Sequence, residues 1–201
     1  MNMKNFLIAM AILLTLPAMG QDLKIGLSLA PTFNFNKYSL KDSSGNYETV
    51  GTAKGTGWKG GIVADMPFTD NYYLHSGFLI HQKSAELESI KTKITTLEIP
   101  LAIKMISNEF SSGMAISATF GGTFDLNVSQ KRIVNDVETD ISDDLNTFGV
   151  SFVTGLGVNY DLGFGTLDAG LSYHLGLTDI SKGGDTKYIP KHLAIDFKFY
   201  F

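Results

Sequence analysis

The chain contains no cysteine, and charged residues make up only 18% of its 201 residues. The absence of cysteine excludes disulfide bonds, a thiolate nucleophile and zinc sites built on cysteine. The low charge content excludes a disordered tail or a charge-rich coiled coil. The net charge is −4, with 16 Lys and Arg against 20 Asp and Glu, so no basic face is available for nucleic acid. What the chain has in abundance is hydrophobic residues (44%) and Gly (21 residues), and its length suits one folded domain.

The one long apolar run lies at the start of the chain. Lys4 precedes an apolar stretch over residues 6–16, and Pro17 is followed by small residues up to Gly20. This order is typical of a secretory signal peptide, whereas a membrane-spanning helix needs about 20 apolar residues. We therefore predict a signal peptide over residues 1–20 and an exported domain over 21–201. An uncleaved N-terminal anchor is the alternative, and a lipoprotein is excluded because no cysteine follows.

After residue 20, apolar and polar residues alternate strictly in eight separate segments. In the first segment every odd position from Leu23 to Phe35 is apolar, while the even positions include Lys24, Ser28 and Asn34. Alternation with a period of two places the two sets of side chains on opposite faces of a β-strand. The predicted strands cover residues 23–35, 58–68, 72–80, 97–105, 114–128, 148–160, 167–177 and 193–201.

The two faces of these predicted strands differ sharply. One face is bulky and apolar and carries no charged residue, and the other consists mainly of Gly, Ser, Ala and Thr. The polar face also carries nine charged residues, which are Lys24, Lys59, Asp65, Glu98, Lys104, Asp125, Asp168, Asp196 and Lys198. A soluble barrel needs a charge-rich outer face. Small polar residues inside and bulky apolar residues outside are instead typical of a barrel in a membrane.

Aromatic residues and connection lengths point the same way. The apolar face has aromatic residues near both strand ends, as in the two girdles of a membrane barrel: Phe33, Phe35, Trp58 and Phe148 at one end, and Phe68, Tyr72, Tyr160, Phe199 and Phe201 at the other. Long polar connections (36–56, 83–92, 129–146, 178–191) alternate with short ones (69–71, 107–112, 161–165). The sequence therefore predicts an all-β, eight-stranded antiparallel up-and-down transmembrane β-barrel in the outer membrane of a Gram-negative bacterium, with a soluble barrel as the alternative.

Two segments resemble known outer-membrane proteins. The stretch Leu97–Lys104, which reads LEIPLAIK, resembles a segment of the small outer-membrane β-barrel family common in Bacteroidetes, called porin-family or PorT-like. The closing residues Phe197, Phe199, Tyr200 and Phe201 resemble the aromatic signal that the barrel-assembly machinery recognises. The resemblance implies an outer-membrane barrel. Because some members of the family are tied to type IX protein secretion, it also implies an accessory role in secretion as an alternative.

The charges on the polar face predict how the barrel interior is filled. They comprise four Lys and five carboxylates, a nearly neutral set. The interior of an eight-stranded barrel is just wide enough for side chains, and unpaired charges there are costly. We therefore predict ion pairs and hydrogen bonds that plug the lumen. A proton or ion path is the alternative.

Candidate reactive groups are few. The four histidines (His75, His81, His174 and His192) share the inward phase but show no His-x-His or His-x-x-x-His spacing, so the sequence predicts no metal site, although a His174–His192 metal pair is conceivable on adjacent strands. Ser172, His174 and Asp168 lie along one strand, so we expect no catalytic constellation.

Two further segments resemble ligand-binding motifs only in part. Residues 131–144 carry five carboxylates but lack EF-hand spacing, so a solvated loop is favoured over a calcium or cationic-partner site. Residues 54–61 are Gly-rich but lack a Gly-Lys-Ser/Thr ending, which excludes a nucleotide site.

The sequence thus predicts a monomeric, non-enzymatic barrel without a cofactor, whose functional surface is its outer loops. An envelope structural or adhesion protein is favoured. An accessory barrel of a secretion system and a lipid-modifying barrel enzyme are the alternatives. The expected partners are outer-membrane lipid and lipopolysaccharide, the barrel-assembly machinery, and envelope or secretion proteins.

Overall fold

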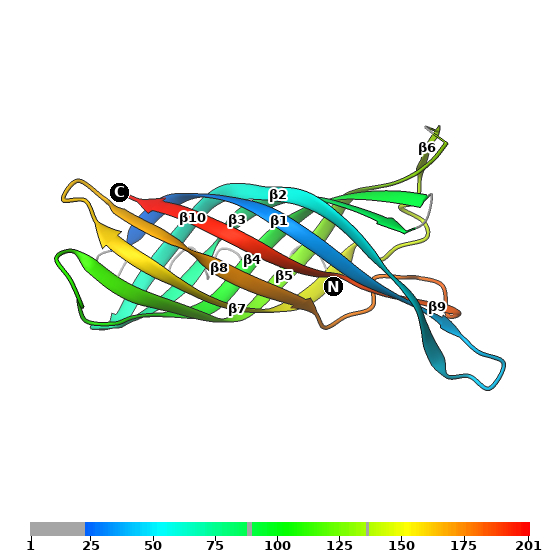
Figure 1. Cartoon of the computed structure of the whole chain (residues 1–201), viewed down its shortest axis with the longest axis horizontal. Helices are drawn as coiled ribbons and strands as arrows, with labels where there is room; N and C mark the ends of the chain where they lie inside the picture. Colours follow the sequence, from blue (N-terminus) through cyan, green and yellow to red (C-terminus); the bar gives the residue numbers. More distant parts are fainter. Residues whose placement is uncertain (1–22, 88–89, 136) are drawn as a thin grey trace, which may run out of the picture.

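A single antiparallel sheet closes on itself in the computed structural model, which describes residues 23–87, 90–135 and 137–201 (Figure 1). The predicted signal peptide over residues 1–20 lies outside the described residues. The strands are β1 (Lys24–Lys41), β2 (Tyr47–Thr69), β3 (Tyr72–Leu87), β4 (Ile90–Ile106), β5 (Met114–Val134), β6 (Val137–Asp140), β7 (Phe148–Asp161), β8 (Thr166–Gly176), β9 (Thr186–Ile189) and β10 (Lys191–Tyr200). The described residues include no helix long and apolar enough to cross a membrane.

Eight of the ten strands form the ring, as the alternation predicts. Each pairs with the next along the chain, and β10 returns to pair with β1, with Leu27 opposite Phe199 and Leu29 opposite Phe197. The remaining two strands, β6 and β9, are short additions that pair with β5 and β1. Closure gives every barrel strand two partners, which satisfies the backbone where no water can do so.

The barrel has apolar side chains outside and polar side chains inside, which confirms the predicted assignment of faces. On β1, Leu27 and Leu29 are 54% and 59% exposed, whereas the intervening Ser28 is 6% exposed and the following Thr32 is 1% exposed. Exposed apolar side chains of this kind occur on every barrel strand. Such an exterior suits contact with lipid.

The connections at one end of the barrel are less irregular than the sequence suggests. Most of the predicted loop over 36–56 is strand, because β1 and β2 stay paired as far as Lys41 and Tyr47. The remaining turn is held by Asp42, whose carboxylate accepts hydrogen bonds from the backbone N–H groups of residues 44 and 46, and by Gly45, whose φ of 87° favours glycine. Polar residues therefore mark where the strands leave the membrane, and not where they end.

The other predicted loops are corrected in the same way. β3 and β4 continue to Leu87 and from Ile90, and residues 131–134 of β5 pair with residues 137–140 of β6. Within the fourth long connection, β9 pairs with β1. Two sheet extensions result, namely β9–β1–β2 and β3–β4–β5–β6, which project from one end of the barrel, while the short turns and the C-terminus lie at the other (Figure 1). In outer-membrane barrels the short turns face the periplasm.

Candidate functional site: the lumen and the outer end

The structure places most of the predicted inward charges deep inside the barrel. Seven of the nine are at most 5% exposed: Lys59, Asp65, Glu98, Lys104, Asp125, Asp168 and Asp196. Lys24 and Lys198 are only half-buried, and the Lys24 ammonium lies over the ring of Tyr73, 5.3 Å from its centroid. The buried charges fall into two clusters along the barrel.

The first cluster surrounds Lys104 near the periplasmic end. The Lys104 Nζ lies 2.8 Å from Asp65 Oδ2 and 2.6 Å from Asp168 Oδ2, so one ammonium joins carboxylates from β2 and β8. His75 Nδ1 lies 2.5 Å from the other oxygen of Asp65. The Lys104 ammonium also donates to the Tyr200 hydroxyl at 3.3 Å. This Lys104 cluster ties together strands on opposite sides of the ring.

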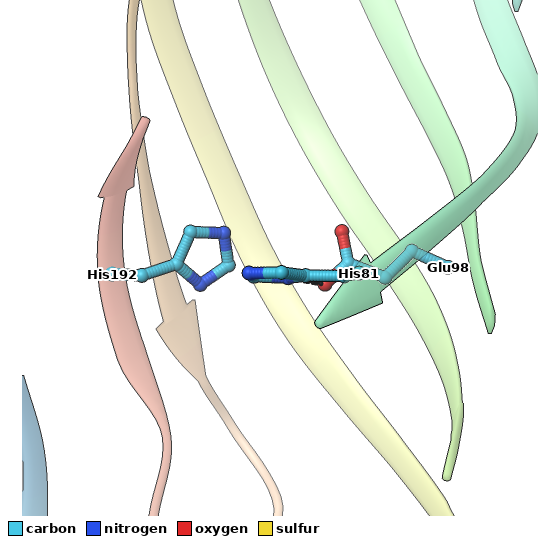
Figure 2. Close-up of side chains that lie close together, drawn as sticks. All are labelled: His81, Glu98 and His192. Carbon is cyan, nitrogen blue, oxygen red and sulfur yellow. Dashed lines mark hydrogen bonds and ion pairs between the residues drawn. The ribbon is translucent and has the colours of Figure 1, made fainter. Parts of the chain in front are cut away.

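The second cluster, called here the histidine cluster, consists of His81, Glu98, His174 and His192 and lies nearer the outer end. His81 Nδ1 is 2.6 Å from Glu98 Oε1, and the His81 and His192 rings meet edge to face at 4.5 Å (Figure 2). The His174 and His192 rings stack at 4.1 Å. The predicted proximity of His174 and His192 is confirmed. The sequence missed His81 and Glu98 as neighbours because they lie on other strands.

Two lysines flank the histidine cluster. Lys59 Nζ lies 2.9 Å from His174 Nε2 and 3.6 Å from Asp196 Oδ1, and Lys83 Nζ lies 3.2 Å from Glu98 Oε1. Lys83 is 8% exposed and was assigned from the sequence to a long loop. The signal that identifies it is continued alternation, because it follows Leu79 and His81 at a spacing of two.

Asp125 stands apart from these ion pairs. Its carboxylate accepts hydrogen bonds from the Thr123 and Ser151 hydroxyls at 3.0 and 2.6 Å, and no salt bridge to it occurs among the described residues. It lies opposite Glu98 in the pairing of β4 with β5. Among the described residues, the hydrogen-bond partners of this buried carboxylate are therefore hydroxyl groups alone.

Little open space remains in the lumen, and its outer mouth is covered. A cavity of about 40 Å³ is lined by Lys59, Glu98 and His174 among others. Above it, Ile180 and Tyr188 from the last long connection pack against Ile94 and against the partly buried Tyr38. Burial raises the pKa of the Tyr188 phenol well above its ordinary value, so this residue stays neutral. An apolar lid thus lies over the polar interior.

The structure brings Ser172 and His174 together but not with Asp168. The Ser172 hydroxyl lies 3.3 Å from His174 Nε2, whereas Asp168 pairs with Lys104 in the other cluster. His174 Nε2 also contacts Lys59, and both members of the Ser–His pair are buried. The Ser172–His174 pair is therefore buried and makes no contact with Asp168.

The acidic segment 131–144 pairs its charges within the outer sheet extension. Glu138 lies 3.0 Å from Lys131 and 3.6 Å from Lys93, and its hydrogen bond from Lys131 lowers the pKa of its carboxyl group. Asp140 accepts hydrogen bonds from the Ser142 backbone and hydroxyl. These contacts occupy the carboxylates of Glu138 and Asp140, and residues 131–134 and 137–140 pair as strands in place of the expected solvated loop.

The terminal aromatic residues divide between the two faces. Phe197 and Phe201 are 48% and 73% exposed on the outside, and Phe199 packs edge to face on Phe201 at 5.3 Å. Tyr200 points inward, is 2% exposed and packs with Val63 and Leu79. Tyr200 therefore belongs structurally to the lumen.

Comparison with known proteins agrees with this geometry. Residues 19–182 match the family described as the outer membrane protein beta-barrel domain. The chain belongs to this family. The match covers β1 to β8 and ends before β9 and β10. Family membership and the closed ring establish an outer-membrane β-barrel protein.

Among solved structures of other outer-membrane barrels, OprG shares the fold. OprG from Pseudomonas aeruginosa aligns with a TM-score of 0.53 at 14% identity, covering 90% of this chain and 96% of OprG. Neisserial surface protein A gives 0.48 at 14% identity, covering 87% and 97%. Ail, the attachment invasion locus protein of Yersinia pestis, gives 0.41 at 12% identity, covering 88% and 98%. Likeness at these identities shows the fold alone. No curated protein matches the chain.

Proposed function

We propose that this outer-membrane barrel neither conducts nor catalyses, and that it acts as a surface-binding protein in adhesion or envelope structure. The observation that carries the proposal is a contrast between the two ends of the molecule. Most of the buried interior charges are paired with one another, while two sheet extensions project from the outer end of the barrel.

The lumen supports the non-conducting part of this proposal. A cavity of about 40 Å³ is close to the space of one water molecule, about 30 Å³ in the liquid. Buried ion pairs such as Lys104 with Asp65 and Asp168 would have to break before an ion could pass. The Ser172–His174 pair, the nearest approach to a hydrolytic site, lies within the same buried interior.

The free edge of β2 supports the surface-binding part. Over residues 47–53, β2 pairs with β1, and its pairing with β3 begins only at Lys54 among the described residues. Tyr47 and Val50 on this segment are 46% and 56% exposed. An exposed sheet edge with unpaired backbone groups is a template for strand addition by a partner. The β9–β1–β2 extension is therefore the favoured binding surface.

A trimmed hairpin tests the proposed function. Tyr38 and Gly51 are paired, so an Asn-Gly turn can replace residues 39–50. We expect cells that display the whole chain to be retained on surfaces coated with extracellular-matrix protein or with cells of the same strain. Cells that display the trimmed variant should fall to the level of cells without the protein.

The matched control trims the other extension. Ala85 and Thr92 are paired, so the same turn can replace residues 86–91. This variant should keep the retention of the whole chain at equal outer-membrane amount. Retention by the whole chain no better than background, or equal retention by both trimmed variants, would contradict a binding role for the β9–β1–β2 extension.

The partners remain part of the proposal. We propose that a monomeric barrel contacts lipid and lipopolysaccharide through its apolar belt and meets the assembly machinery through its last strand. The resemblance of Leu97–Lys104 to PorT-like barrels supports a second candidate, an accessory role in protein secretion. Cross-linking in cells followed by purification separates the two, because only the second predicts secretion-system proteins among the cross-linked partners.

A further inference from the structure

Two side chains from neighbouring strands and one from across the barrel converge in the outer half of the lumen. His81 comes from β3, Glu98 from β4 and His192 from β10, and Figure 2 shows them pointing toward one another. One nitrogen or oxygen atom from each lies within 4.8 Å of the others. The three residues are at most 4% exposed. Two imidazoles and a carboxylate form a ligand set that zinc accepts.

Several atoms of this cluster have no hydrogen-bond partner among the described residues. They are Glu98 Oε2, His192 Nε2 and His174 Nδ1, all fully buried. Buried polar atoms are almost always hydrogen-bonded, because an unsatisfied one costs about 1–3 kcal/mol. These three buried atoms lie within one cluster, and a bound ligand would satisfy them.

The local charge also favours a cation. Three buried carboxylates lie near the site, from Glu98, Asp125 and Asp196, against the two buried ammonium groups of Lys59 and Lys83, while the half-buried Lys198 lines the same cavity. Asp125 has only hydroxyl partners within the described part of the chain. One excess negative charge in a poorly hydrated interior is stabilised by a bound cation.

We propose that the lumen binds one divalent metal ion of the zinc type through His81, Glu98 and His192. The ion takes His192 Nε2 and Glu98 Oε2, both of which are free. His81 now contacts Glu98 through Nδ1 and Thr32 through Nε2, so it becomes a ligand by exchanging one of these hydrogen bonds. The fourth position falls to His174, stacked on His192, or to a water in the adjoining cavity.

The distances allow this site with side-chain movement alone. Ligand atoms in a tetrahedral zinc site with bonds of about 2.1 Å are about 3.4 Å apart, so the present limit of 4.8 Å requires a contraction of about 1.4 Å. Rotation of the Glu98 and His192 side chains would have to supply this shift. The metal would join the neighbouring strands β3 and β4 to β10, which does not pair with either of them, and so brace the barrel across its lumen.

The test is a titration with Zn²⁺ alone. The tag-free chain, refolded in detergent and heat-modifiable on a gel, should bind one Zn²⁺ in calorimetry. With Co²⁺ in place of Zn²⁺ it should give visible absorption bands typical of four-coordinate nitrogen and oxygen ligation. His192→Gln should weaken binding by about 10- to 100-fold or more, and Glu98→Gln should do the same.

The matched control is His75→Gln, which also removes a buried histidine but lies in the Lys104 cluster, where it bonds to Asp65. It should leave Zn²⁺ affinity unchanged. Absence of both Zn²⁺ binding and the Co²⁺ bands in the wild-type chain overturns the proposal, even if a variant fails to fold. Unchanged affinity in His192→Gln, or an equal loss in His75→Gln, overturns it as well.

Discussion

Lys104 illustrates at the residue scale how a charge is accommodated inside this barrel. Its side chain is almost completely buried, and its ammonium touches Asp65, Asp168 and the Tyr200 hydroxyl. Burial of an isolated ammonium would carry a large desolvation free energy. Lys104 can therefore be buried only because the two carboxylates pair with it. In turn, Lys104 is the ammonium partner of each carboxylate.

Replacement of Lys104 by Met is expected to destabilise the barrel strongly. The change leaves two buried carboxylates without their shared cation, for which we expect a loss of about 3–5 kcal/mol in the free energy of unfolding. Urea unfolding of the protein in lipid vesicles measures this loss. The control is Lys24→Met, where a half-buried ammonium over Tyr73 is worth only about 0.5–1 kcal/mol. Similar losses in the two variants would mean that the Lys104 cluster does not hold the barrel together.

Alternation in the sequence identifies which side chains face inward but not which of them meet. Lys104 and Asp168 lie on β4 and β8, strands that are not neighbours in the ring. Their contact depends on strand tilt and on the register of several successive pairs, which no single segment contains. The same holds for the approach of His192 on β10 to His81 and Glu98 on β3 and β4. The inward phase of these residues was predictable, and their convergence was not.

At the scale of the strand, similarly exposed apolar side chains lie in two different environments. Leu171 on β8 and Val50 on β2 are 53% and 56% exposed. Leu171 lies mid-strand on the lipid-facing side of the ring, whereas Val50 lies on the extension beyond it. Only the first should face hydrocarbon.

A lysine at each of these positions separates the two environments. Leu171→Lys should cost about 2–4 kcal/mol of folding free energy, since the bilayer midplane penalises a charge. Val50→Lys should change it by less than about 0.5 kcal/mol, as expected for a surface site in water. The measurement is unfolding in vesicles by urea. A comparable cost at both positions would contradict the placement of the membrane.

The last strand carries the prediction about assembly. If its terminal aromatic residues are recognised by the assembly machinery, Phe201→Ser should lower the amount of protein in the outer membrane several-fold while leaving refolding in detergent nearly unchanged. One interfacial aromatic contributes only part of the about 1.5–3 kcal/mol of a full burial. The control is Phe164→Ser in a short turn, since Phe164 is similarly exposed (77% against 73%). Equal delivery of both variants would show that Phe201 carries no signal.

Strand number, order and faces followed from the period-two pattern, but strand ends did not. The pattern stops where one face leaves the membrane, because beyond that point both faces meet water and residues such as Lys41, Glu48 and Lys54 can sit on either side. The strands nevertheless continue, since backbone groups still pair across the hairpin. Composition therefore locates the membrane boundary better than it locates the strand boundary.

At the scale of the whole molecule, the sequence pattern predicts the ring but not the cover over its outer mouth. The ring follows from eight alternating segments, whereas the lid depends on long-range packing of Ile180 and Tyr188 against Ile94. The connection that contains Ile180 and Tyr188 reads as a polar loop, and only the fold shows that its apolar residues turn inward. The alternating pattern therefore predicts the ring, whereas the packing of the interior is seen only in the structure.

The central claim is that this outer-membrane barrel has a filled lumen and works from its surface. Reconstitution of the heat-modifiable species into planar lipid bilayers tests it most directly, with a porin measured in parallel to prove insertion. We predict no single-channel conductance above the bilayer baseline, because the buried ion pairs and the apolar lid leave a cavity of only about 40 Å³. Reproducible open-channel steps from the wild-type chain would contradict the claim.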